Sequence, residues 1–154
     1  MDSITIRKAT ISDVPALVML RRLMFESMGC NDTELLHSGD LAAKKYFNRS
    51  ISTNDFQGWV AVNSDGVIVS NIGVVFDQHP PGPNNLSGKI AYLMNLYTLA
   101  SYRRQGIARK LLEEALTWIK ELGITRVALH ATEMGKELYT GIGFTETSEM
   151  RLKM

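Results

Sequence analysis

The chain has 154 residues, of which 45% are hydrophobic and 21% are charged. That balance suits a globular protein with one core, and we predict a single domain over residues 1–154. The formal net charge of +1 gives no overall field that would attract nucleic acid or a membrane surface. A single cysteine, Cys30, excludes an internal disulfide and fits a reducing compartment. Because the sequence shows neither a signal-peptide core nor about 18 consecutive apolar residues, we expect a soluble cytoplasmic protein.

The N-terminal third is predicted to hold one strand and two helices. Alternating side chains predict a strand over Ser3–Lys8. A helix begins within Ser12–Pro15, because proline is tolerated in the first helical turn, and runs to about Met28, with Gly29 as its C-cap. After a polar stretch, a second helix is predicted over Leu41–Ile51.

A β-hairpin and an irregular loop are predicted next. The strands Gly58–Val62 and Val67–Phe76 are joined by Asn63–Gly66, whose Asp-Gly pair is a strong hairpin signal. The prolines of the following segment, His79–Asn85, exclude a strand there. Such a loop lies on the surface and often borders a binding site.

The C-terminal half alternates strands with helices. A strand over Ile90–Leu99 is apolar on both faces, which predicts an interior position in the sheet. An amphipathic helix over Ile107–Leu122 and a strand over Thr125–Leu129 follow, so a parallel strand pair with a right-handed crossover is expected. The remaining predicted elements are a short helix over Met134–Thr140 and two strands, Phe144–Glu146 and Met150–Met154, that complete the sheet.

The most informative segment is the basic turn Arg103–Ala108, which joins an apolar strand to an amphipathic helix. The first N–H groups of a helix have no intrahelical partner, and the helix dipole adds partial positive charge there. Gly106 allows close approach of a ligand to the backbone, and the cationic side chains nearby add formal charge. The turn therefore predicts a site for a phosphorylated ligand, and a diphosphate fits it best.

Two common phosphate motifs do not match this turn. A P-loop needs Gly-x-x-x-x-Gly-Lys-Ser/Thr, which the chain lacks. A dinucleotide-binding fold needs Gly-x-Gly-x-x-Gly after an early strand, whereas this turn has one glycine and follows a late strand.

Two blocks resemble the GNAT N-acetyltransferase superfamily. Arg103-x-x-Gly106-x-Ala108 is similar to the family's Gln/Arg-x-x-Gly-x-Gly/Ala acyl-CoA signature, within the block Leu96–Leu116. Downstream, Leu138–Phe144 resembles the family's Leu-Tyr-x-x-x-Gly-Phe segment. The resemblance implies a mixed α/β (α+β) GNAT-type fold, with a mostly antiparallel sheet of about six to seven strands, about four flanking helices and splayed central strands.

The same resemblance implies how acetyl-CoA is held. The backbone N–H groups of the basic turn grip the pyrophosphate, the arginines add charge, and the pantetheine arm pairs with exposed backbone as an added strand. The implied cofactor-binding residues are Leu96, Tyr97, Thr98, Arg103, Arg104, Gln105, Gly106, Ile107, Ala108, Arg109 and Thr132. Thr132 stands where the family often has an asparagine, and its hydroxyl is the expected substitute. No metal ligands are expected.

The implied reaction is acetyl transfer to an amine by direct attack. By its position, the N–H of Leu96 is the candidate oxyanion donor. Tyr139 occupies the family's position for the acid that protonates the departing thiolate. The alternative is that Tyr139 is only a packed aromatic side chain on a short helix. No base is assigned; the side chains considered are Glu26, Asp77, His79 and His130, with Tyr92 or Asn95 holding a water.

The acceptor is predicted only as a class, a primary amine of a small molecule or a peptide. The segments expected to shape its cleft contribute Glu26, Asp32, Glu34, His37, Asp40, Tyr46 and the proline-rich loop at 80–83. These acids suit a cationic amine, and a solvated helix face explains them equally well.

Two other interpretations of the function stay open. The chain is alternatively a non-catalytic acyl-CoA sensor or a partner subunit, or an unrelated α+β fold whose basic turn binds another phosphate. A homodimer is also expected, because the final apolar strand, with Met150, Leu152 and Met154, offers an edge that a second copy can pair with.

Overall fold

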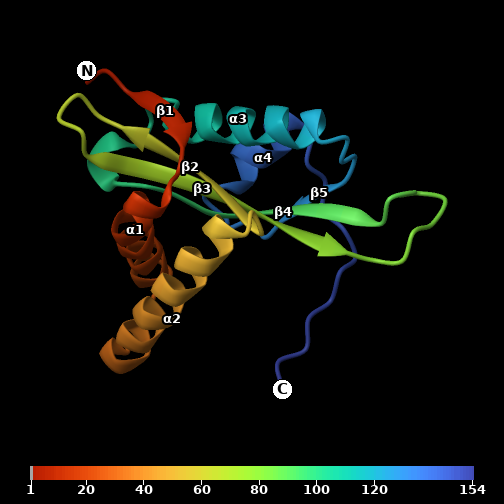
Figure 1. Ribbon diagram of the computed structural model, residues 1–154, viewed down its shortest axis with the longest axis horizontal. Coiled ribbons are helices and arrows are strands. Elements are labelled where there is room, and N and C mark those ends of the chain that lie inside the picture. Colours follow the sequence, from red (N-terminus) through yellow and green to blue (C-terminus); the bar gives the residue numbers. More distant parts are fainter. Residues whose placement is uncertain (1) are drawn as a thin grey trace.

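The computed structural model describes residues 2–154 and shows one twisted sheet with helices on both faces (Figure 1). The elements in chain order are β1 (Thr5–Lys8), the short 3-10 helix η1 (Ile11–Asp13), α1 (Val14–Ser27), α2 (Thr33–Ser52), β2 (Phe56–Val62), β3 (Ile68–Gln78), β4 (Lys89–Thr98), the 3-10 turn η2 (Ala100–Tyr102), α3 (Ile107–Glu121), β5 (Val127–Leu129) and α4 (Lys136–Ile142).

The strands lie side by side in chain order, β1-β2-β3-β4-β5. The first four pair antiparallel, and β5 pairs parallel with β4, which confirms the predicted strand–helix–strand crossover. The predicted hairpin is also confirmed. The side-chain oxygen of Asn63 accepts hydrogen bonds from the N–H groups of Asp65 at 3.0 Å and Val67 at 2.9 Å, which stabilises the turn between β2 and β3.

The sheet separates two hydrophobic cores. On one face α1 and α2 cover a cluster that includes Val14, Leu17, Phe47 and Val60. On the other face α3 and α4 cover a larger cluster, in which the buried residues of α3 are Ile107, Leu111, Leu112, Ala115 and Ile119. The amphipathic character predicted for this helix is therefore confirmed, and each helical layer is fixed to the sheet by its own apolar contacts.

Strand β4 carries a β-bulge in its second half. Asn71 of β3 pairs with Tyr97 and Gly73 pairs with Met94, so that Ile72 alone faces Asn95 and Leu96. Asn95 has a φ of 61°, a left-handed conformation that asparagine tolerates better than most residues. A bulge of this kind bends the strand and changes where its side chains and backbone groups point.

The pairing of β4 with β5 ends just before this bulge. Its last register pair is Leu93 with Leu129, and within the described residues 94–98 of β4 have no partner on β5. One backbone edge of β4 is therefore left open between α3 and α4, as the expected splaying of the central strands requires.

The structure corrects the start of the second helix. Helix α2 begins at Thr33, not at Leu41, because the carboxylate of Asp32 accepts hydrogen bonds from the N–H groups of Glu34 and Leu35, both at 3.1 Å. The first turns are polar and only Leu36 among them is buried, so the apolar period on which the prediction rested begins later than the helix.

The structure also corrects the sheet, which over residues 2–154 has five strands and not six or seven. The predicted strands Phe144–Glu146 and Met150–Met154 do not form; the C-terminal segment runs away from the body (Figure 1), with residues 145–154 all exposed. The sequence pattern of these segments does not make a strand unless a neighbouring strand offers a backbone edge of matching length. The last strand, β5, has only three residues. The homodimer expected from this segment stays a prediction.

None of the helices over residues 2–154 combines the length and the apolarity that crossing a membrane requires.

Candidate active site

A cleft of about 410 Å³ lies along the open edge of β4, and we call it the β4 cleft. Its lining brings together seven of the residues predicted from the sequence: Leu96, Tyr97, Thr98, Arg103, Ala108, Thr132 and Tyr139. They come from β4, the turn after it, the start of α3 and the segment before and within α4. The predicted residues that do not line the cleft, 104–107 and Arg109, form the adjoining turn and the first helical turn.

The turn before α3 is shaped to present backbone N–H groups. Arg104 and Gly106 both have left-handed φ angles, 60° and 79°. Such a turn arranges successive N–H groups into a concave site for an anion. A Cβ built on Gly106 meets no atom within 4 Å, so open space faces this backbone. Within residues 2–154 the N–H groups of 105–108 have no hydrogen-bond acceptor.

The two arginines of the turn differ. The Arg103 Nε donates to the Thr98 carbonyl at 3.0 Å, and the guanidinium lies 5.3 Å from the Tyr97 ring centroid. Arg103 is thus held across the end of β4 by its neighbours. Arg104 is exposed, and it adopts a left-handed conformation that costs a non-glycine residue about 1 kcal/mol. Strain of this kind is typical of binding sites.

Tyr139 lies half-buried on α4 and faces the β4 cleft. Burial raises the pKa of its phenol, because an apolar environment disfavours the charged phenolate. The ring packs edge-on against Phe144, with 5.9 Å between the centroids. A Cβ at Gly135 would lie 2.8 Å from a carbon of this ring, so the position of Tyr139 depends on a glycine that the sequence analysis did not single out.

Thr132 has a local structural contact. Its hydroxyl accepts a hydrogen bond from the Gly135 N–H at 3.3 Å, and its carbonyl accepts from the N–H groups of Gly135 and Lys136, both at 3.1 Å. The side chain therefore stabilises the turn into α4 and borders the cleft at the same time.

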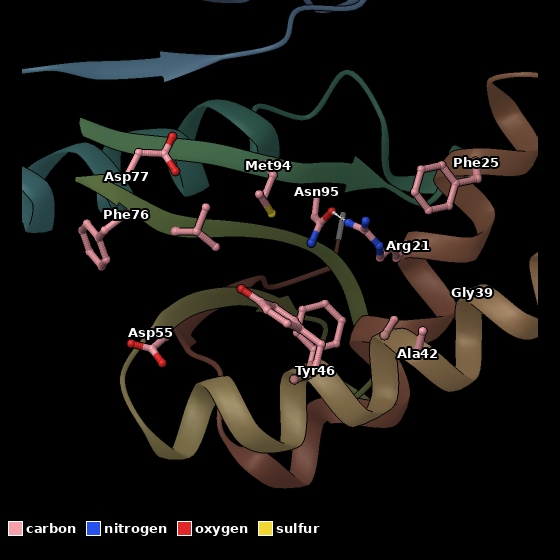
Figure 2. Close-up of a pocket in the computed structure, with 13 residues that line it drawn as sticks. Arg21, Phe25, Gly39, Ala42, Tyr46, Asp55, Phe76, Asp77, Met94 and Asn95 are labelled. Carbon is pink, nitrogen blue, oxygen red and sulfur yellow. Dashed lines mark hydrogen bonds between the residues drawn. The ribbon is translucent and has the colours of Figure 1, made fainter. Parts of the chain in front are cut away.

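A second cavity, of about 680 Å³, lies on the opposite side of β4 between α2, α1 and the sheet, and we call it the α2 pocket (Figure 2). Much of its lining is apolar, with Phe25, Ala42, Phe47 and Met94 among the contributing side chains. Charged groups lie at its ends, Arg21 at one and Asp55 and Asp77 at the other (Figure 2).

The β4 bulge is shared by both cavities. Met94 and Asn95 line the β4 cleft and the α2 pocket alike. The Asn95 side chain is fixed by Arg21 of α1, whose guanidinium donates to its amide oxygen. Leu96, the next residue, lies in the β4 cleft. The two cavities therefore adjoin at the bulge.

The side chains predicted to shape an acceptor cleft are mostly elsewhere. Tyr46 lines the α2 pocket, whereas Asp32 caps α2, and Glu26 and Asp40 pair with Arg22 at 3.3 and 2.7 Å. The exposed residues Glu34 and His37 lie in neither cavity, and the proline-rich loop borders a separate hollow with His79. The pair of Arg22 with Glu26 and the cap at Asp32 are local, whereas the pair of Arg22 with Asp40 joins α1 to α2 and is not contained in a linear motif.

Among the side chains considered as a base, Asp77 lines the α2 pocket and His130 lines the β4 cleft, whereas Glu26 and His79 line neither. Arg21 and Asp55 also line the α2 pocket, and neither was predicted from the sequence. Arg21 lies 74 residues from the asparagine it contacts, so no local signal marks it.

The family model for the acetyltransferase (GNAT) family matches residues 20–144, and the chain belongs to that family. No curated protein sequence matches the chain.

Solved structures agree with the family. A GCN5-related N-acetyltransferase from Ralstonia eutropha is 30% identical, with a TM-score of 0.90 over 99% of each chain. A predicted acetyltransferase from Clostridium acetobutylicum, solved with acetyl-CoA, is 27% identical, with a TM-score of 0.88 over 99% of this chain and 96% of that one. Glucosamine-6-phosphate N-acetyltransferase from Arabidopsis thaliana shares the fold at 19% identity and a TM-score of 0.72, over 99% and 98% of the two chains.

Proposed function

We propose that this protein transfers an acetyl group from acetyl-CoA to a primary amine of a small molecule or peptide, by direct attack. The observation that carries the proposal is the pair of cavities that meet at the β4 bulge. The β4 cleft has the features that an acyl-CoA needs, and the α2 pocket gives an amine access to the same point. A cytoplasmic location is part of the proposal and rests on the single cysteine.

The residues of the β4 cleft fit acetyl-CoA. The N–H groups of 105–109 would hold the pyrophosphate at the start of α3, and Arg104 would add charge. The open backbone edge of β4 at 96–98 would pair with the amides of the pantetheine arm, as an added strand does. Thr132 and Ala108 border this path.

Acetyl-CoA supplies an activated acetyl group as a thioester, and two groups of the chain act on it. The N–H of Leu96 would donate a hydrogen bond to the carbonyl oxygen as negative charge develops there. The phenol of Tyr139 would hold a proton for the departing sulfur. Its raised pKa supports this role, because a phenol that stays protonated is ready to donate.

Calorimetry with acetyl-CoA tests the cofactor site first. We expect the double variant Arg104→Glu, Gly106→Glu to lose binding at least about a hundredfold, because negative charge and a side chain replace the anion site. Lys120→Glu in the last turn of α3 is the matched control and should bind like the wild type. A folded wild-type protein that does not bind acetyl-CoA would contradict the proposal.

Release of free thiol with a panel of amines tests the reaction. Amine-dependent release that tracks the formation of acetylated amine supports an enzyme. Acetyl-CoA binding without turnover of any amine would instead favour the non-catalytic sensor.

A further inference from the structure

Two adjacent arginines of α1 have opposite surroundings. Arg22 pairs with Asp40 at 2.7 Å and with Glu26 at 3.3 Å. Arg21 points into the α2 pocket, and among residues 2–154 it has no carboxylate within ion-pair distance. Its hydrogen-bond partner is the neutral amide oxygen of Asn95.

The Arg21 guanidinium is also partly removed from water. It lies over the ring of Phe25, 4.8 Å from the centroid, and burial lowers its pKa. A half-buried cation without a counter-charge is costly unless a partner neutralises it. Guanidinium has five N–H donors in a planar fork, so the contact with Asn95 leaves donors for a carboxylate.

The far end of the α2 pocket has the opposite charge. Asp55 precedes β2 and Asp77 lies near the end of β3, and Figure 2 shows both carboxylates at the end of the pocket away from Arg21. Neither of them forms an ion pair within the described chain, and Asp55 accepts a hydrogen bond from the Thr53 hydroxyl at 2.8 Å. Side chains such as Phe47, Val75 and Met94 give an apolar surface between the two ends.

The chemistry takes place at the arginine end. Arg21 contacts Asn95, and the following residue, Leu96, carries the N–H that we propose as oxyanion donor. An acceptor amine that reaches the thioester therefore lies beside Arg21. A further ammonium group of the acceptor is disfavoured next to the Arg21 guanidinium, whereas a carboxylate is favoured there.

We propose that the acceptor is an α-amino acid with a basic side chain, whose α-amine is acetylated. Its carboxylate binds Arg21, its methylene chain lies on the apolar surface, and its distal cation lies at the acidic end of the pocket, which holds Asp55 and Asp77. This inference rests on the proposed function and gives it a substrate class. In the reaction the α-nitrogen forms a bond to the acetyl carbon, the carbon–sulfur bond breaks, and the thiolate takes up the proton held by Tyr139. The nitrogen loses a proton to solvent, and the Tyr139 phenolate takes up a proton from solvent, so the enzyme returns to its starting state.

Three related amines separate the parts of this proposal. L-lysine has every feature, L-lysinamide lacks the carboxylate, and L-norleucine lacks the distal cation. With saturating acetyl-CoA, we expect kcat/KM for lysine to exceed that of each analogue at least tenfold. Chromatography against standards should identify the lysine product as the Nα-acetyl form.

Matched variants test which group of the substrate binds at each end of the pocket. Arg21→Gln should lower kcat/KM for lysine at least about tenfold more than it lowers kcat/KM for lysinamide, so that the advantage of lysine over lysinamide is lost. Asp55→Asn with Asp77→Asn should lower kcat/KM for lysine more than kcat/KM for norleucine, so that the advantage of lysine over norleucine is lost. Arg22→Gln, which removes a neighbouring guanidinium outside this pocket, should leave lysine turnover unchanged.

Several results would overturn the substrate class. They are an Nε-acetyl product, an analogue as good as lysine, an Arg21→Gln variant that slows all three amines equally, or efficient turnover of other amines with none of lysine. In each case retained acetyl-CoA binding and thiol release would leave the proposed function intact. Loss of wild-type acetyl-CoA binding itself would remove both.

Discussion

The two cavities that adjoin at the β4 bulge differ in the kind of group that faces a ligand. The β4 cleft presents main-chain groups: an open strand edge at 94–98 and the unpaired N–H groups at the start of α3. The α2 pocket presents side chains, with Arg21 at one end and Asp55 and Asp77 at the other. Backbone groups bind a ligand that stays the same across a family, whereas side chains can change with the acceptor. Selectivity should therefore depend on the α2 pocket, and catalysis on the β4 cleft.

The largest effect is expected from Tyr139→Phe, which changes the β4 cleft and not the α2 pocket. Removal of the phenol should lower kcat about a hundredfold and leave KM nearly unchanged, because the proton is needed only as the thiolate departs. Steady-state thiol release measures both constants. Tyr92→Phe is the control, since Tyr92 lines neither cavity; equal turnover of Tyr139→Phe and wild type would remove Tyr139 from the mechanism.

The pH profile of kcat gives a second comparison of the wild type with Tyr139→Phe. In the proposed mechanism the acid form of Tyr139 is the active one, and burial raises its pKa, so activity should persist to a higher pH than an ordinary tyrosine, with its pKa of about 10, allows. Activity is then lost as pH rises through the raised pKa of Tyr139. This alkaline limb should be absent in Tyr139→Phe.

A smaller effect is expected from Ala42→Trp, which fills part of the α2 pocket. We expect kcat/KM for the amine to fall about tenfold, because the acceptor is displaced from the bulge, with acetyl-CoA affinity unchanged. Lys45→Trp places the same ring at an exposed position of α2 outside the pocket and serves as control. If Ala42→Trp weakened acetyl-CoA binding as much as turnover, the two cavities would not have separate roles.

The smallest effect is expected from Thr132→Ala in the β4 cleft. Loss of the hydroxyl that accepts from the Gly135 N–H should cost about 0.5–1 kcal/mol of stability, as the loss of a helix cap does, and change acetyl-CoA affinity less than about threefold. Denaturant unfolding and calorimetry measure the two quantities. A tenfold loss of affinity would instead mean that Thr132 contacts the cofactor directly.

The parts of the fold that follow from local patterns could be predicted from the sequence. The Asp-Gly hairpin, the apolar strand β4 and the amphipathic character of α3 depend on neighbouring residues, and the structure confirms each. The start of α2 depends on a cap at Asp32, not on an apolar period, so a search for periodicity placed it too late. The C-terminal strands need an edge to pair with, which no property of residues 144–154 provides.

The same distinction holds for the candidate site. The basic turn and Tyr139 lie in short motifs, and the structure brings both to the β4 cleft. The charged ends of the α2 pocket come from α1, the turn after α2 and the end of β3. Their placement around one pocket depends on how the helical layer packs on the sheet. Linear spacing does not contain that information.

The position of Met94 and Asn95 on both cavity walls has a consequence for inhibitor design. A molecule with one head for each cavity would need only a short linker past the bulge, because the two cavities adjoin there. Once one head is bound, the other is confined near its own cavity at an effective concentration of the order of millimolar, and the overall affinity can exceed that of either head by about 10²–10⁴. Such a tethered ligand would combine the family-wide affinity of one head with the selectivity of the other.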